Sequence, residues 1–138
     1  MLRAAKDALI ITRIMPKAKI MIVEDEPMLA LELKEDLIEL GYEIPDVLSD
    51  GDTVLAAVAK THPDLIMMDI KLYGYRDGID AATRLRAFYK TPVIFLTSYP
   101  LSEIGDRIGR LDGVIYIGKP YKIENLSQII ESALAGKN

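Results

Sequence analysis

Short hydrophobic runs alternate along the chain with longer stretches in which hydrophobic residues recur at helical spacing. Four of these runs contain no charged residue. They lie at residues 20–23, 65–68, 93–96 and 114–117. An unbroken run of this length, bounded by turn residues, is typical of a strand that helices cover on both faces of a parallel sheet. We therefore expect these strands to be central, and a weaker run at 44–48, interrupted by Pro45, to lie at an edge of the sheet.

The stretches between the runs predict amphipathic helices. Their apolar positions begin near residues 29, 54, 79, 101 and 123. The third helix is expected to extend as far as Phe88, and the fourth is weakened by Gly105 and Gly109. Strict alternation of five strands with five helices predicts an α/β fold. We expect a flavodoxin-like, doubly wound, five-stranded parallel sheet in the order 2-1-3-4-5, between two layers of helices.

The composition narrows the class of protein without identifying it. With 138 residues the chain has the length of one domain, expected at 17–138 after an N-terminal extension at 1–16 that is a helix, an arm or a disordered segment. A net charge of −4 without a Lys/Arg cluster argues against a nucleic-acid surface, and no stretch is long enough to span a membrane. The absence of cysteine excludes disulfides and thiolate chemistry, and it suits a cytoplasmic protein.

Polar and charged residues follow the four hydrophobic runs, where a parallel sheet usually binds its ligands. They are Glu24 and Asp25 after the first run, then Asp69, Thr97 and Lys119. Three carboxylates brought together repel one another, and a hard divalent cation such as Mg²⁺ relieves this repulsion because it prefers oxygen ligands. A neighbouring lysine and hydroxyl complete a set suited to phosphoryl transfer, in which a carboxylate can be the acceptor and become an aspartyl phosphate.

At these positions the chain resembles the receiver domain of two-component response regulators, of the chemotaxis-regulator type, from about residue 19 to residue 134. The motifs that carry the resemblance are Ile22-Val23-Glu24-Asp25-Glu26, Met68-Asp69-Ile70, Asp77-Gly78, Leu96-Thr97-Ser98 and Gly118-Lys119-Pro120. The resemblance extends over nearly all of the chain beyond the N-terminal extension, so it concerns the whole predicted domain.

The resemblance implies a role for each site residue. Asp69 is the implied phosphoacceptor. The implied ligands of Mg²⁺, or alternatively of Mn²⁺, are the carboxylates of Glu24, Asp25 and Asp69 and the backbone carbonyl of Lys71. Thr97 and Lys119 would contact the phosphoryl group, and Thr97 with Tyr116 would form a switch. The Lys119–Pro120 peptide bond is expected to be cis.

By the same resemblance the chain is a signalling domain and not an enzyme in the usual sense. The expected partners are a sensor histidine kinase or phosphotransfer protein that supplies the phosphoryl group, and a downstream protein target or a fused output domain. The surface formed by residues 100–135 would respond, and a phosphorylation-dependent homodimer is a further expectation. We expect no contact of this domain with nucleic acid or membrane.

Two other functions stay open from the sequence. One is a receiver-like interaction domain that works without phosphorylation. The other is a phosphatase of the haloacid-dehalogenase type, which would place its nucleophile on the first strand and a second Asp where this chain has Lys71.

Two features depart from the commonest receiver pattern. The loop between Asp69 and Gly78 is one residue longer and lacks the usual proline. Tyr99 lies two residues beyond Thr97, and its bulk is expected to slow hydrolysis of the phosphoryl group.

Overall fold

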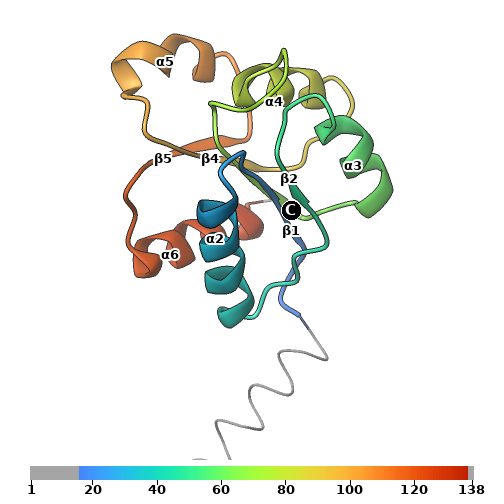
Figure 1. Ribbon diagram of the computed structural model, residues 1–138, viewed down its shortest axis with the longest axis vertical. Helices are drawn as coiled ribbons and strands as arrows, with labels where there is room; N and C mark the ends of the chain where they lie inside the picture. The colour runs from blue at the N-terminus through green and yellow to red at the C-terminus, as the bar shows by residue number, and fades with distance from the viewer. Residues whose placement is uncertain (1–15, 137–138) are drawn as a thin grey trace, which may run out of the picture.

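Five strands and five helices alternate in the computed structural model, which describes residues 16–136 (Figure 1). The strands are β1 (Ile20–Val23), β2 (Val47–Leu48), β3 (Leu65–Met68), β4 (Val93–Thr97) and β5 (Val114–Gly118). The helices are α2 (Pro27–Glu39), α3 (Val54–Thr61), α4 (Gly78–Arg86), α5 (Leu101–Ile108) and α6 (Ile123–Ala135). The extension predicted at 1–16 lies outside the described residues except for Pro16.

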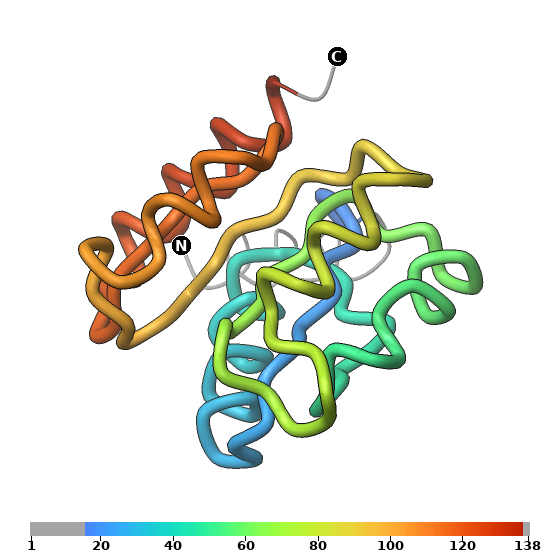
Figure 2. The backbone as a smooth tube through the Cα atoms, turned by 90° about the horizontal axis from the view of Figure 1, so that it is seen from above, coloured from blue at the N-terminus to red at the C-terminus, as the bar shows by residue number. Residues whose placement is uncertain are grey.

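The sheet has the predicted topology. All strand pairs are parallel, and the order β2-β1-β3-β4-β5 confirms the flavodoxin-like prediction. In Figure 2, β1 lies between α3 on one side and α5 and α6 on the other; α5 and α6 overlap in this view although they cover opposite faces of the sheet. Helices α2 and α6 cover one face of the sheet, whereas α3, α4 and α5 cover the opposite face.

Each central strand contributes to two hydrophobic cores. Successive side chains of a strand point to opposite faces, so Met21 packs on the side of α3, α4 and α5 while Ile22 packs on the side of α2 and α6. In β3, Ile66 and Met67 divide in the same way, and every residue of β1 and β3 is buried. Burial on both faces explains why these strands appear in the sequence as unbroken hydrophobic runs.

The expectation that 114–117 forms a central strand is wrong. In the observed order β5 is an edge strand, paired only with β4, and its residues are half-buried or exposed. Val114 and Tyr116 nevertheless pack against one core, and Ile115 and Ile117 against the other. A hydrophobic run therefore reports that helices cover both faces of a strand, and it does not report how many strands lie beside it.

The third helix ends earlier than expected. Helix α4 stops at Arg86, and Phe88 is 70% exposed, so Phe88 is not part of the core. The Arg86 guanidinium donates to the backbone carbonyls of Tyr89 and Thr91 and, across the next loop, to those of Asp112 and Gly113. These bonds hold the chain in a turn that leads directly into β4.

The edge strand predicted at 44–48 is present but short. Only Val47 and Leu48 pair with β1, at Ile22 and Val23. Before Pro45, Glu43 forms an isolated parallel bridge with Lys19, and its carbonyl accepts the Ile20 amide at 2.8 Å. Proline has no backbone N–H to donate, and Pro45 separates this bridge from the strand.

The register brings the carboxyl ends of the strands to one level. Val23 pairs with Met68, and the Asp69 amide continues this ladder by donating to the Val23 carbonyl at 2.9 Å. On the other side the Lys119 amide donates to the Thr97 carbonyl at 2.9 Å. The residues that follow β1, β3, β4 and β5 therefore lie together at the carboxyl ends of the strands.

Candidate functional site

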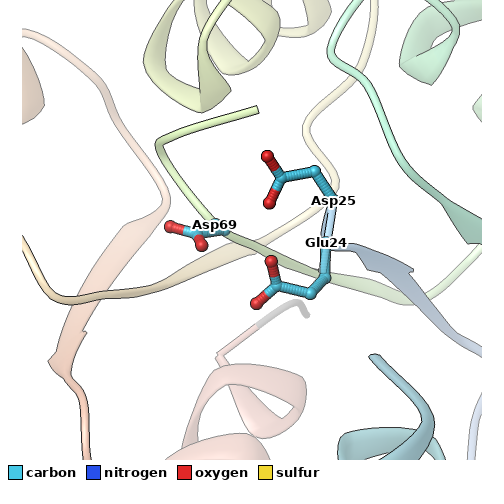
Figure 3. A group of neighbouring side chains, drawn as sticks. All are labelled: Glu24, Asp25 and Asp69. Atoms are coloured by element: carbon cyan, nitrogen blue, oxygen red, sulfur yellow. The ribbon is translucent and has the colours of Figure 1, made fainter. Parts of the chain in front are cut away.

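Three carboxylates gather where β1 and β3 end (Figure 3). Carboxylate oxygens of Glu24, Asp25 and Asp69 lie within 4.8 Å of one another. Glu24 is 7% exposed, and the other two are half-buried. Burial raises the pKa of Glu24, and the negative charge of Asp69 acts in the same direction, while the hydrogen bond from Lys119 opposes both. Such a cluster of hard oxygen atoms can hold a divalent cation.

Lys119 from the end of β5 partly neutralises this cluster. Its Nζ atom donates to Glu24 Oε1 at 2.7 Å and to Asp69 Oδ2 at 3.0 Å. Burial acts to lower the pKa of Lys119, but these hydrogen bonds and the two negative charges together raise it above its usual value. The Lys119–Pro120 bond is cis, as predicted.

Asp69 is held through both of its carboxylate oxygens. Oδ1 accepts the Ile70 amide at 2.7 Å and the Lys71 amide at 3.3 Å, while Oδ2 accepts from Lys119. Asp69 and Lys71 border a cavity of about 650 Å³, which Asp25, Thr97 and Tyr99 also line. The cavity has room for a group larger than a metal ion.

Thr97 and Tyr116 are linked through the backbone of Tyr99. Thr97 is buried, and its Oγ1 accepts the Tyr99 amide at 3.2 Å. The Tyr116 hydroxyl donates to the Tyr99 carbonyl at 2.7 Å. Tyr99, expected only to slow hydrolysis of the phosphoryl group, thus also connects the two predicted switch residues through hydrogen bonds to its backbone.

The longer loop after Asp69 is anchored on the loop that precedes α3. Asp52 accepts from the Tyr75 amide and from the Arg76 guanidinium, each at 3.3 Å. Gly74 has φ +95°, a conformation that L side chains rarely adopt, and a Cβ there would meet the Asp52 carboxylate. The sequence indicated the extra length of this loop but not the residue on which it rests.

A further ion pair, which the sequence did not indicate, joins α5 to the start of α4. Arg107 binds the carboxylate of Asp77 through two hydrogen bonds, at 2.7 and 3.0 Å. Its Nη2 also donates to Asp80 at 3.0 Å. Arg107 and Asp77 are 30 positions apart, so helical or strand periodicity carries no signal for their contact.

Of all the predicted site residues, the structure brings together Glu24, Asp25, Asp69, Thr97 and Lys119 around one cavity. The Lys71 side chain is exposed, and its carbonyl remains only a predicted ligand. Tyr116 lies one hydrogen bond removed from the cavity, through Tyr99. No helix within residues 16–136 has both the length and the hydrophobicity to cross a membrane.

Comparison with known proteins agrees with this geometry. The family model of the response regulator receiver domain matches residues 20–131. The transcriptional regulatory protein PdtaR of Mycobacterium tuberculosis is 33% identical over 117 residues, which cover 85% of this chain and 57% of PdtaR. The transcriptional regulatory protein BaeR of Escherichia coli is 38% identical over 104 residues, 75% of this chain and 42% of BaeR. The chain therefore spans about half the length of these relatives.

Solved structures show the same similarity. The signal receiver domain of a modulated diguanylate cyclase from Desulfovibrio desulfuricans superposes with a TM-score of 0.81 at 33% identity, over 87% of this chain and 95% of that one. The receiver domain of PhyR from Erythrobacter litoralis gives 0.75 at 31% identity, over 88% and 92%. None of these relatives singles out the chemotaxis-regulator type. With the family model, they show that this chain belongs to the response regulator receiver domains of two-component signal transduction.

Proposed function

We propose that this receiver takes a phosphoryl group onto Asp69 from a phosphohistidine of a sensor histidine kinase or phosphotransfer protein. The observation that carries the proposal is the contact of Lys119 with both Glu24 and Asp69, inside a cluster of three carboxylates that borders a cavity. An oxygen of Asp69 bonds to phosphorus as the phosphorus–nitrogen bond breaks, and the electron pair of that bond returns to the imidazole of the donor.

Each neighbouring residue has a part in this transfer. Glu24, Asp25, Asp69 and the Lys71 carbonyl hold Mg²⁺, or alternatively Mn²⁺, which when bound neutralises the oxygens of the transferring group. The Ile70 and Lys71 amides orient the Asp69 carboxylate through Oδ1. Lys119 is already hydrogen-bonded to Asp69 and moves onto a phosphoryl oxygen, which leaves its positive charge next to the new negative charge.

The response then passes through Thr97 and Tyr116. Phosphorylation adds a charge of about −1.5 to −2 with strong acceptor oxygens. Thr97 donates its hydroxyl to one of these oxygens and shifts toward Asp69. The backbone amide of Tyr99 is hydrogen-bonded to Thr97, and its backbone carbonyl to Tyr116. A shift of Thr97 therefore alters the surface formed by α5, β5 and α6.

The altered surface relays the signal to a downstream protein target or to an output domain of a longer protein, and a phosphorylation-dependent homodimer is one form that this relay takes. Several relatives are named transcriptional regulators and extend well beyond the region they share with this chain. The domain acts in the cytoplasm and catalyses only its own phosphorylation and dephosphorylation. It contacts neither nucleic acid nor membrane.

The test is labelling by a small phosphodonor such as acetyl phosphate with Mg²⁺, followed by intact mass spectrometry. Wild type is expected to gain one phosphoryl group, and Asp69→Asn none. Asp106→Asn, at an exposed position on α5, is the matched control and is expected to be labelled normally. Labelling of Asp69→Asn at the wild-type rate would contradict the assignment.

A Mg²⁺ titration followed by tyrosine fluorescence separates this function from an interaction domain that works without phosphorylation, for which no response is expected.

A further inference from the structure

Arg107 connects α5, which belongs to the predicted signalling surface, to the start of α4. Its guanidinium donates two hydrogen bonds to the Asp77 carboxylate and one to the Asp80 carboxylate. Among residues 16–136 these are the only ion pairs that join α5 to another element. A single exposed ion pair contributes little to stability, but a bidentate arginine–carboxylate contact is the geometry in which such pairs are strongest.

The partners of Arg107 form the cap of α4. The Asp77 carboxylate accepts the Asp80 amide at 2.8 Å, and the Asp80 carboxylate accepts the Asp77 amide at 3.3 Å. Two carboxylates are thereby brought together, and the Arg107 guanidinium lies against both of them. Burial acts to raise the pKa of Asp77, but the hydrogen bonds from Arg107 and the Asp80 amide lower it. Arg107 thus relieves the repulsion inside the cap.

The first residue of α4 packs directly on the backbone of the phosphoacceptor. The Gly78 amide donates to the Ile70 carbonyl at 2.7 Å. A Cβ at Gly78 would meet the Asp69 carbonyl oxygen and would lie 2.9 Å from Ile70 Cα. The start of α4 therefore has no freedom to move without moving the Asp69–Ile70 backbone, which precedes the proposed metal-binding carbonyl of Lys71.

We propose that Arg107 is a positioning residue for the phosphoacceptor loop. Through Asp77 and Asp80 it fixes the start of α4, and through Gly78 it fixes the backbone from Asp69 to Lys71. The signalling helix α5 is therefore coupled to the Mg²⁺ site by a route that does not pass through Thr97 or Tyr116. The relevance of this coupling to signalling rests on the proposed function, whereas the coupling itself is a property of the fold.

The direction of the effect on Mg²⁺ affinity distinguishes positioning from simple charge. Removing a cation near a metal site tightens metal binding if charge alone matters. If Arg107 positions the loop, Arg107→Gln weakens Mg²⁺ binding instead, by about threefold, a modest coupling for residues in contact. Arg107→Lys keeps the charge but lacks the planar fork, so an intermediate affinity is expected. Arg110→Gln removes the same charge from an exposed position close by and is the matched control.

Hydrogen exchange at the Gly78 amide gives a readout that needs no metal. Arg107→Gln is expected to speed this exchange by about threefold, with Arg110→Gln unchanged. Asp77→Ser retains a residue that caps helices well but removes the carboxylate that Arg107 binds, so its Gly78 amide is expected to exchange as fast as that of Arg107→Gln. In the double variant this exchange should be no faster than in either single variant. Far-ultraviolet circular dichroism confirms that each variant is folded.

The outcomes separate this proposal from the proposed function. Equal Gly78 exchange in Arg107→Gln, Arg110→Gln and wild type would overturn the positioning role, as would tighter Mg²⁺ binding by Arg107→Gln. A wild-type protein that neither binds Mg²⁺ nor becomes labelled on Asp69 would refute the proposed function, and Gly78 exchange would then decide on Arg107 alone.

Discussion

Replacing Lys119 by methionine tests how strongly the acidic cluster depends on its internal cation. In the wild type the ammonium lies 2.7 Å from Glu24 and 3.0 Å from Asp69, and the three side chains are 16%, 6% and 12% exposed. Removing one partner of a fully buried ion pair costs about 3–5 kcal/mol. Because Lys119 keeps some contact with water, we expect Lys119→Met to lower the free energy of unfolding by about 2–3 kcal/mol without Mg²⁺.

The loss should depend on pH, with a sign that the structure fixes. The pKa of Glu24 is already raised by burial, and without the opposing hydrogen bond from Lys119 it rises further. A carboxyl with a higher pKa in the folded than in the unfolded state binds more protons when folded, so stability increases as the pH falls through the folded pKa. Lys119→Met should therefore recover part of its stability as the pH falls from 7 toward the raised pKa of Glu24, because Glu24 becomes neutral.

Thermal unfolding followed by circular dichroism measures both effects. At pH 7 without metal the variant is expected to unfold about 10 °C below wild type. At the same Mg²⁺ concentration the variant should be stabilised more than wild type, because loss of the Lys119 charge tightens Mg²⁺ binding. The variant is expected to gain about 2.7 kcal/mol when Mg²⁺ is in hundredfold excess over its Kd. Lys90→Met, at an exposed lysine, is the control and should change little. An unfolding temperature of Lys119→Met equal to that of wild type at pH 7 would refute the reasoning.

Two further predictions concern the walls of the site. Gly78→Ala should destabilise the protein by about 2 kcal/mol and weaken Mg²⁺ binding, because the new methyl group would meet the Asp69 carbonyl; urea unfolding and tyrosine fluorescence measure these changes, and unaltered values for both would contradict the close packing. Tyr99→Ala should speed the release of phosphate from the labelled protein, because Tyr99 borders the cavity; a time course of dephosphorylation tests this, and equal rates would dismiss a shielding role.

The strands and the gathering of polar residues at their ends could be predicted because local patterns encode both. A run such as 65–68 is hydrophobic throughout since both of its faces are buried, and Asp69 follows where the chain leaves the core. The same pattern misled at 114–117, because two covering helices make an edge strand look central. The end of α4 was misplaced as well, since it depends on bonds of Arg86 to a loop far along the chain.

The fine geometry of the site could not be predicted for a related reason. That Lys119 touches Glu24 as well as Asp69 depends on the register of strands that are distant in sequence. The contact of Arg107 with Asp77 depends on how two helices lie over the same face of the sheet. Residue types indicated which groups would be present, but only the folded backbone determines which of them are in contact.

The turn around Arg86 has a consequence for how motion spreads through the sheet. Its guanidinium donates to carbonyls that lie just before β4 and just before β5, at the amino ends of these strands, whereas Asp69 lies at the carboxyl end of β3. The two strands are thus clamped at their amino ends, whereas at their carboxyl ends they carry Thr97 and Lys119. We therefore expect the proposed rearrangement to be largest beside the cavity and to decrease along β4 and β5 toward Arg86.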